Sequence, residues 1–156
     1  MKDVISSVSP TGLPLLRAYQ VEIGRAVLGS VKENRGLTFS IEIARQGGKN
    51  EISAQLELLL LILNMERGGD IIKCSPTFKP QSLISLARLQ DKLKQAGIER
   101  LCRVTHGNIL SLGRARVVFY SAEPSSHVVG ATAHLLLEVD EAQDVDKEKF
   151  SRDFKP

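Results

Sequence analysis

The chain has 156 residues, an apolar fraction of 42%, a formal net charge of +3 and two cysteines. These values fit one globular domain with a core and argue against global disorder. The two cysteines are far apart in the sequence and form no CxxC pair, so they support neither a zinc site nor a structural disulfide. The longest apolar run is too short to cross a bilayer and the first residues lack a signal-peptide core, so we expect a cytoplasmic protein without a membrane partner.

The elements expected from the sequence begin after a polar lead-in over residues 1–14, which is rich in turn-forming residues. Apolar spacing predicts an amphipathic helix over 15–34, and strict alternation predicts a strand over 37–43. After Gly48 the period changes, and we expect a leucine-rich helix over 49–66.

The second half of the chain alternates short apolar runs with one more helical pattern. Strands are expected over 70–75, 101–106, 115–121 and 134–143, with a helix over 80–96 and a turn over 107–113. Strands that alternate with helices are typical of an α/β fold whose sheet is covered by helices on both faces.

A glycine-rich junction stands between the expected strand over 37–43 and the helix that follows it. Gly47, Gly48 and Lys49 have the composition of a phosphate-binding loop. In such a loop small residues let backbone N–H groups converge on phosphate oxygens, and the lysine reaches the terminal phosphates. Asn50 replaces the usual serine or threonine, and its amide oxygen is a ligand of a type that Mg²⁺ accepts. A chance turn is the alternative for this motif taken alone.

The sequence LLLEVDEAQ at 135–143 carries two acidic residues at the end of an apolar run. Asp140 at the carboxyl end of a strand can hold Mg²⁺, and Glu141 can orient and deprotonate an attacking water. A solvated acidic strand end is the alternative. The combination with Lys49 is more specific than either motif, because both then lie at the edge of the sheet where ligands bind.

A third feature, LLRAYQ at 15–20, precedes the first expected strand. Tyr19 can stack on an adenine ring, and the Gln20 amide can form a bidentate pair with the adenine edge. Alone, this string also fits the ordinary start of an amphipathic helix.

Four segments together resemble the ATPase domain of the large terminase subunit of tailed bacteriophages, the motor that packages viral DNA. They are RAYQ (17–20), ARQGGKNE (44–51), SPTFKPQ (75–81) and VVGATAHLLLEVDEAQDV (128–145). The resemblance covers about residues 15–156. It implies a P-loop NTPase of the RecA/ASCE-like type, a three-layer sandwich with a mostly parallel sheet.

The resemblance also implies roles for individual residues, with ATP and Mg²⁺ as the bound species. Glu141 would be the catalytic carboxylate, and Arg45 would be the loop arginine that contacts the γ-phosphate and helps to trigger hydrolysis. Asp140 and Asn50 would hold Mg²⁺. The residues implied in ATP binding are Arg17, Tyr19, Gln20, Gln46, Gly47, Gly48, Lys49 and Asn50.

The implied partners are those of the intact family protein: double-stranded DNA, the portal, the small terminase subunit and further copies in a homo-oligomeric ring. The location would be the cytoplasm of a host cell. Because the family continues with further strands and a nuclease domain, we expect residues 15–156 to be the first part of an ATPase domain with an incomplete sheet and no nuclease activity.

Two other functions fit the same residues. DEAQ at 140–143 also resembles motif II of a superfamily 2 helicase-like ATPase core, although the early Arg45 favours the terminase. A nucleotide- or DNA-binding module without turnover is the second possibility. ATP turnover that depends on Glu141 separates the two enzymes from this module.

Overall fold

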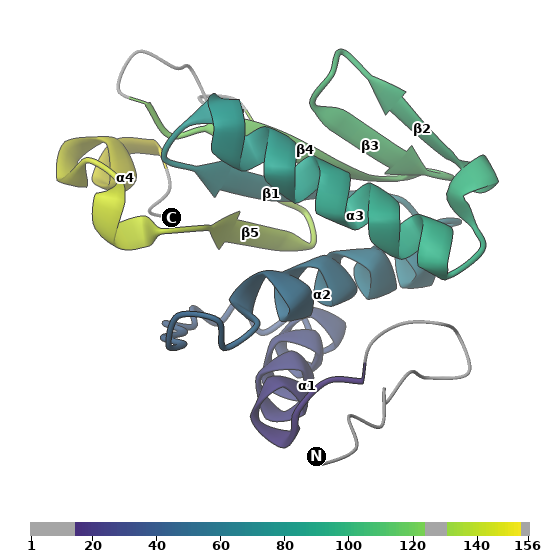
Figure 1. Ribbon diagram of the computed structural model, residues 1–156, viewed down its shortest axis with the longest axis horizontal. Coiled ribbons are helices and arrows are strands. Elements are labelled where there is room, and N and C mark those ends of the chain that lie inside the picture. Colours follow the sequence, from purple (N-terminus) through teal and green to yellow (C-terminus); the bar gives the residue numbers. More distant parts are fainter. Residues whose placement is uncertain (1–14, 124–130, 154–156) are drawn as a thin grey trace, which may run out of the picture.

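The computed structural model describes residues 15–123 and 131–153, which form an α/β fold built on one five-stranded sheet (Figure 1). The expected lead-in over 1–14 lies outside the described residues. The strand order is β2-β3-β4-β1-β5. The strands are β1 (Gly69–Ser75), β2 (Cys102–Thr105), β3 (Ile109–Leu112), β4 (Ala115–Ser121) and β5 (Leu136–Val139).

The sheet is mostly parallel, as the sequence predicts. The central strand β1 pairs in parallel with β4 on one side and with β5 on the other. The pairs β2–β3 and β3–β4 are antiparallel, so four of the five strands run in one direction and β3 opposes them. The carboxyl ends of β1, β4 and β5 therefore lie at the same edge of the sheet.

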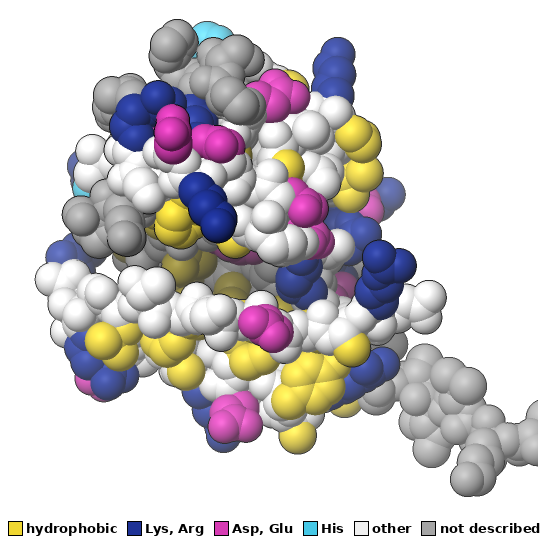
Figure 2. Space-filling model, turned by 90° about the vertical axis from the view of Figure 1, so that its left-hand side faces the viewer, with side chains coloured by type: hydrophobic (Ala, Val, Ile, Leu, Met, Phe, Trp, Pro, Cys, Tyr) yellow, Lys and Arg dark blue, Asp and Glu magenta, His cyan; other side chains and the backbone are white. Residues whose placement is uncertain are grey.

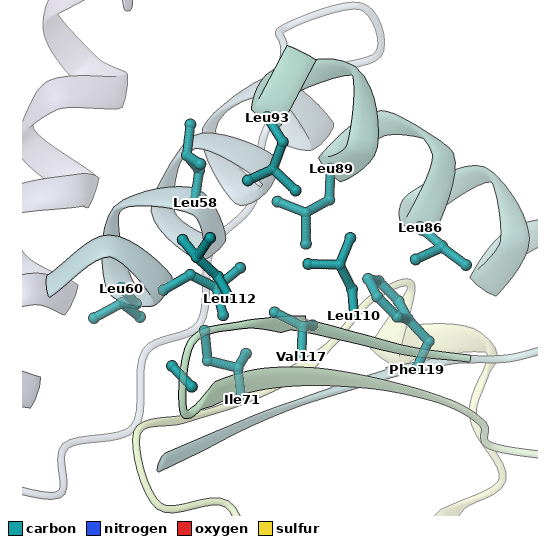
Figure 3. Close-up of a cluster of buried hydrophobic side chains, with 12 residues drawn as sticks. Leu58, Leu60, Ile71, Leu86, Leu89, Leu93, Leu110, Leu112, Val117 and Phe119 are labelled. Atoms are coloured by element: carbon teal, nitrogen blue, oxygen red, sulfur yellow. The ribbon is translucent and has the colours of Figure 1, made fainter. Parts of the chain in front are cut away.

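Two long helices cover one face of this sheet. They are α2 (Lys49–Asn64) and α3 (Leu83–Gln95), and their leucines point onto β1, β3 and β4 (Figure 3). Leu61, Leu89 and Leu93 are completely buried against the strands. Each such side chain contributes about 1.5–3 kcal/mol by leaving water, so this apolar layer is the main source of stability.

The opposite face has a smaller cover. The short helix α4 (Lys147–Asp153) and the segment before it pack Val145 and Phe150 over Ile72 and Cys74. Helix α1 (Ala18–Lys32) packs on α2 instead of on the sheet. The expected three layers are thus present only over β1 and its neighbours.

No helix within 15–123 and 131–153 has the length and apolar character that a membrane crossing requires.

The predicted strand over 37–43 is wrong. These residues belong to no strand in the structure, and Leu37 and Phe39 are exposed by 51% and 38%. Alternating apolar residues make a strand only where a neighbouring backbone supplies hydrogen bonds, and none of the described strands runs beside this segment. Only Ile43 packs inward, against α1 and α2. The glycine-rich loop therefore does not follow a sheet strand.

Two further boundaries differ from the sequence prediction. The expected turn over 107–113 contains a strand of its own, β3, in which Leu110 and Leu112 are buried. The expected strand over 134–143 is shortened to β5, and its last residues form the turn that carries Asp140 and Glu141. The remaining predicted elements are confirmed to within three residues at each end.

Candidate functional site

Two distant segments of the chain meet at the carboxyl end of β5. Helix α2 begins at Lys49, and Asp140 and Glu141 directly follow the last residue of the strand. The backbone N–H of Asp140 donates to the Cys74 carbonyl at 2.8 Å, so pairing with β1 continues beyond β5. This continuation fixes the position of the first acidic residue.

The Lys49 ammonium lies between the two carboxylates. Its Nζ is 2.8 Å from Asp140 Oδ1 and 2.5 Å from Glu141 Oε1. The Lys49 side chain is 34% exposed and the Asp140 side chain 15%, so solvent reaches the group from one side. The structure confirms that these three residues come together, although residues 15–48 contain no strand.

The ion pair between Lys49 and Glu141 shifts the pKa values of both residues toward their charged forms. Partial burial alone would lower the pKa of Lys49, but hydrogen bonds and the charges of Asp140 and Glu141 outweigh it, so the pKa is raised. The hydrogen bond from Lys49 lowers the pKa of Glu141, with the Gln143 amide and the charge of Arg45 adding to the effect. Arg45 is thus close enough to the acidic end to act on it electrostatically.

The loop before α2 requires both of its glycines. A Cβ on Gly47 would lie 2.4 Å from the Ile43 side chain and 2.8 Å from the Ala44 carbonyl oxygen. Gly48 has a φ of 82°, and a Cβ there would lie 2.5 Å from the Gln20 amide nitrogen. The chain therefore passes closely over its neighbours directly before α2 begins, and the N-terminus of a helix is a place where anions commonly bind.

Two residues without glycine's freedom also have left-handed backbone conformations here. Gln46 has a φ of 62° and Glu141 a φ of 49°. Such conformations cost free energy and occur preferentially where a site must hold a side chain in one direction. Both strained positions flank Lys49, one in each of the segments that meet there.

The segment predicted to read adenine lies against the loop. The Tyr19 hydroxyl donates to the Gly47 carbonyl, and Gln20 Nε2 donates to the Gly48 carbonyl at 3.0 Å. Gln20 Oε1 accepts from the Arg17 N–H at 2.8 Å, and the side chain is only 4% exposed. The Gln20 amide therefore connects the start of α1 to the loop. It would have to break these two hydrogen bonds before it could bind an adenine.

An open hollow of about 610 Å³ lies beside the loop. Its lining includes Arg17, Tyr19, Arg45 and Gln46, four of the residues that the sequence predicts for ATP binding and catalysis. Figure 2 shows the end of the molecule that carries α4 and the loop before α2, with charged side chains of both signs on its surface. The hollow lies between the start of α1 and the loop, and neither α4 nor Lys49 lines it. Its size is that of an ordinary small-molecule pocket.

Asp140 and Glu141 are carboxylates, the type of protein ligand that Mg²⁺ prefers. No three His, Cys, Asp or Glu side chains gather as metal ligands within 15–123 and 131–153. Mg²⁺ is commonly bound by one or two carboxylates with waters and substrate phosphates completing the shell, so Asp140 fits the ion when a nucleotide brings it. Asn50, the second residue of α2, stands at the same loop with an amide oxygen.

The sequence analysis missed a buried polar cluster next to these residues. It consists of Ser53 and Glu57 on α2, Lys73 on β1 and Glu138 on β5, which hydrogen bond to one another. The available signal was spacing: Ser53 and Glu57 follow Lys49 at intervals of four, and Glu138 precedes Asp140 by two. Residues so spaced share one side of their helix or strand.

A scan of the sequence against protein-family models gives no match, and searches of curated proteins and of solved structures give none either. The site itself combines a lysine at a helix N-terminus, a glycine loop fixed by its neighbours, and two carboxylates at a strand end.

Proposed function

We propose that the chain binds ATP with Mg²⁺ at the loop over 44–50 and hydrolyses it, as a P-loop ATPase related to the terminase large subunit. The observation that carries this proposal is the meeting of Lys49 with Asp140 and with Glu141, which lies 92 positions further along the chain than the lysine. A cation at a glycine-rich helix start beside strand-end carboxylates is the arrangement that phosphate and Mg²⁺ binding requires.

In this account the Lys49 ammonium exchanges its carboxylate partners for oxygens of the β- and γ-phosphates. The helix N-terminus of α2 adds favourable partial charge to the same anion. The bound Mg²⁺ would neutralise charge on the phosphates, with Asp140 as its protein carboxylate. We assign to Arg45, which lies on the exposed loop and acts electrostatically on Glu141, the contact with the γ-phosphate.

Glu141 is the proposed base that orients the attacking water and takes its proton. Release of Lys49 frees Glu141 Oε1, which accepts from the ammonium in this structure. The other oxygen accepts from the Gln143 amide at 2.5 Å, so the carboxylate keeps a fixed direction after the exchange. After Lys49 leaves, the Gln143 amide and the charge of Arg45 still lower the pKa of Glu141 and favour its ionised form, which a proton acceptor requires.

The finer identity belongs to the same proposal. Action on double-stranded DNA, contact with a portal and a small terminase subunit, and assembly into a ring are properties of the family that the four segments resemble. A superfamily 2 helicase-like ATPase would use the same carboxylates. Nucleotide binding without turnover is the competing function, favoured by the firm hold of Lys49 on both carboxylates.

A titration with a fluorescent ATP analogue and Mg²⁺ tests the proposal. We expect saturable binding that Lys49→Ala and Asp140→Ala each weaken by about tenfold or more, because each removes a charged contact worth roughly 1.5–3 kcal/mol. Lys32→Ala, at the end of α1, is the control for loss of one positive charge. Glu141→Gln should bind the analogue but release no phosphate.

Absence of saturable binding by the folded wild-type chain would overturn the proposal. Binding with no phosphate release by either wild type or Glu141→Gln would leave a nucleotide-binding module and remove the ATPase from the proposal.

A further inference from the structure

A row of polar side chains crosses the otherwise apolar contact between α2 and the sheet. Lys49, Ser53 and Glu57 lie at intervals of four on the helix, so they share one face. Opposite them, Glu138 lies in β5 and Asp140 follows the last residue of that strand. The two rows face each other in opposite chain directions, and Lys49 meets Asp140 at 2.8 Å.

The second contact in this row lies one helical turn deeper. The Ser53 hydroxyl donates to Glu138 Oε1 at 2.6 Å. Ser53 is 7% exposed and the Glu138 side chain is 24% exposed, so this hydrogen bond is partly shielded from water. It joins the first turns of α2 to β5 immediately behind the candidate nucleotide site.

The third contact is a buried ion pair on β1. Lys73 Nζ lies 2.8 Å from Glu57 Oε1 and 3.0 Å from Glu138 Oε1, and it also donates to the Ser53 hydroxyl. The side chains of Lys73 and Glu57 are 4% and 1% exposed. Lys73 and Glu138 are also register neighbours on adjacent parallel strands, so the backbone ladder holds one side of the cluster.

Stability alone does not explain this cluster. Leucines surround it on α2, and apolar side chains of similar size commonly stabilise an interior as well as a buried ion pair does. Apolar contacts tolerate small sliding movements of a helix, whereas hydrogen bonds are sensitive to distance and direction. The property that the cluster adds is therefore a fixed position of α2 along β5.

We propose that Ser53, Glu57, Lys73 and Glu138 form a positioning cluster that sets α2 against β5 so that Lys49 faces Asp140 and Glu141. None of the four touches the nucleotide in this account; they act through the residues one turn above. The role in nucleotide affinity rests on the proposed function, while the placement of Lys49 does not.

The decisive variant is Ser53→Ala, with Ser82→Ala as its matched control. Ser82 is 1% exposed and donates to the Tyr120 carbonyl at 3.0 Å, so each substitution removes one buried serine hydroxyl. The first measurement is the rate at which an amine-acylating reagent modifies Lys49, followed by mass spectrometry. The second is affinity for the fluorescent ATP analogue with Mg²⁺.

We expect Ser53→Ala to raise the acylation rate of Lys49 and to weaken analogue binding, each by roughly two- to tenfold, the range of one buried hydrogen bond. Ser82→Ala should lower the melting temperature similarly and change neither readout. Ser53→Thr, which retains the hydroxyl, should restore both.

Equal behaviour of Ser53→Ala and Ser82→Ala, or failure of the threonine to restore either readout, would overturn the positioning role. If the wild-type chain binds no nucleotide, the proposed function fails while the acylation rates still decide whether the cluster positions Lys49.

Discussion

Strand β1 carries two ion pairs that are alike in construction and opposite in surroundings. At its amino end Asp70 pairs with Arg116 on β4, and further along Lys73 pairs with Glu138 on β5. Both pairs join register neighbours on parallel strands. The Arg116 side chain is 50% exposed, whereas that of Lys73 is 4% exposed and covered by α2.

The exposure of each ion pair determines how much its loss destabilises the fold. The Asp70–Arg116 pair is open to solvent at Arg116 and makes two hydrogen bonds, so we expect it to contribute about 1 kcal/mol, the upper end of the range for surface pairs. A buried pair is strongly destabilised by the loss of either partner, because the remaining charge is then buried without an opposite charge beside it. The buried cluster around Lys73 lies toward the end of the sheet that carries Lys49 and Asp140. The Asp70–Arg116 pair lies toward the other end.

The largest expected effect comes from Lys73→Met. Removal of the ammonium leaves two carboxylates facing each other in a buried site, so we expect a loss of about 3–5 kcal/mol in the free energy of unfolding. Arg116→Met, the matched change in the exposed pair, should cost about 1 kcal/mol. Urea denaturation of both variants measures the difference.

Addition of Glu57→Leu and Glu138→Gln to Lys73→Met should recover most of the lost stability, because no uncompensated charge then remains buried. Equal losses for Lys73→Met and Arg116→Met would contradict the distinction between the two pairs.

The second prediction concerns pH. Burial raises the pKa of Glu57 from an ordinary 4.5 to about 7; Lys73 on β1 opposes the rise and Glu138 on β5 adds to it. Between these pH values the folded state holds a proton that the unfolded state has released, so the contribution of Glu57 to stability falls as the pH rises. Glu57→Gln should make the melting temperature less dependent on pH over this window. The same dependence on pH in the variant and the wild type would contradict the burial of the Glu57 carboxyl.

The exposed pair should respond to pH with the opposite sign and a smaller amplitude. The hydrogen bond from Arg116 lowers the pKa of Asp70 below its ordinary 3.8, against the opposing effect of burial. Its stabilisation is therefore present above pH 3.8 and is lost as the pH falls through the lowered value. Asp70→Asn should remove this acid-limb dependence, and added salt should reduce it in the wild type, because the pair is partly solvated.

Local patterns predict much of this fold. The apolar runs of β1 and β4 and the leucine spacing of α3 are confirmed, because each depends on residues close in sequence. Chain order and element type also place Asp140 and Glu141 correctly at a strand end near Lys49.

What failed depends on partners distant in sequence. Apolar and polar residues alternate over 37–43, as they do in many strands. A strand forms only where a neighbouring strand supplies backbone hydrogen bonds, and none of the described strands pairs with this segment. Lys73 stands in an apolar run, and nothing local shows that Glu57 and Glu138 will enclose it. Buried polar clusters of this kind are defined by tertiary packing, so spacing gave only a hint.

A nitrogen-15 NMR titration with a non-hydrolysable ATP analogue and Mg²⁺ tests the central claim most directly. The account predicts the largest shifts at the backbone amides of Gly47, Gly48, Lys49 and Asn50, with further shifts at Asp140 and Glu141 as Lys49 changes partners. Amides around Asp70 and Arg116 should stay in place. Absence of shifts at the loop, or saturable shifts confined to another surface, would contradict a nucleotide site at the start of α2.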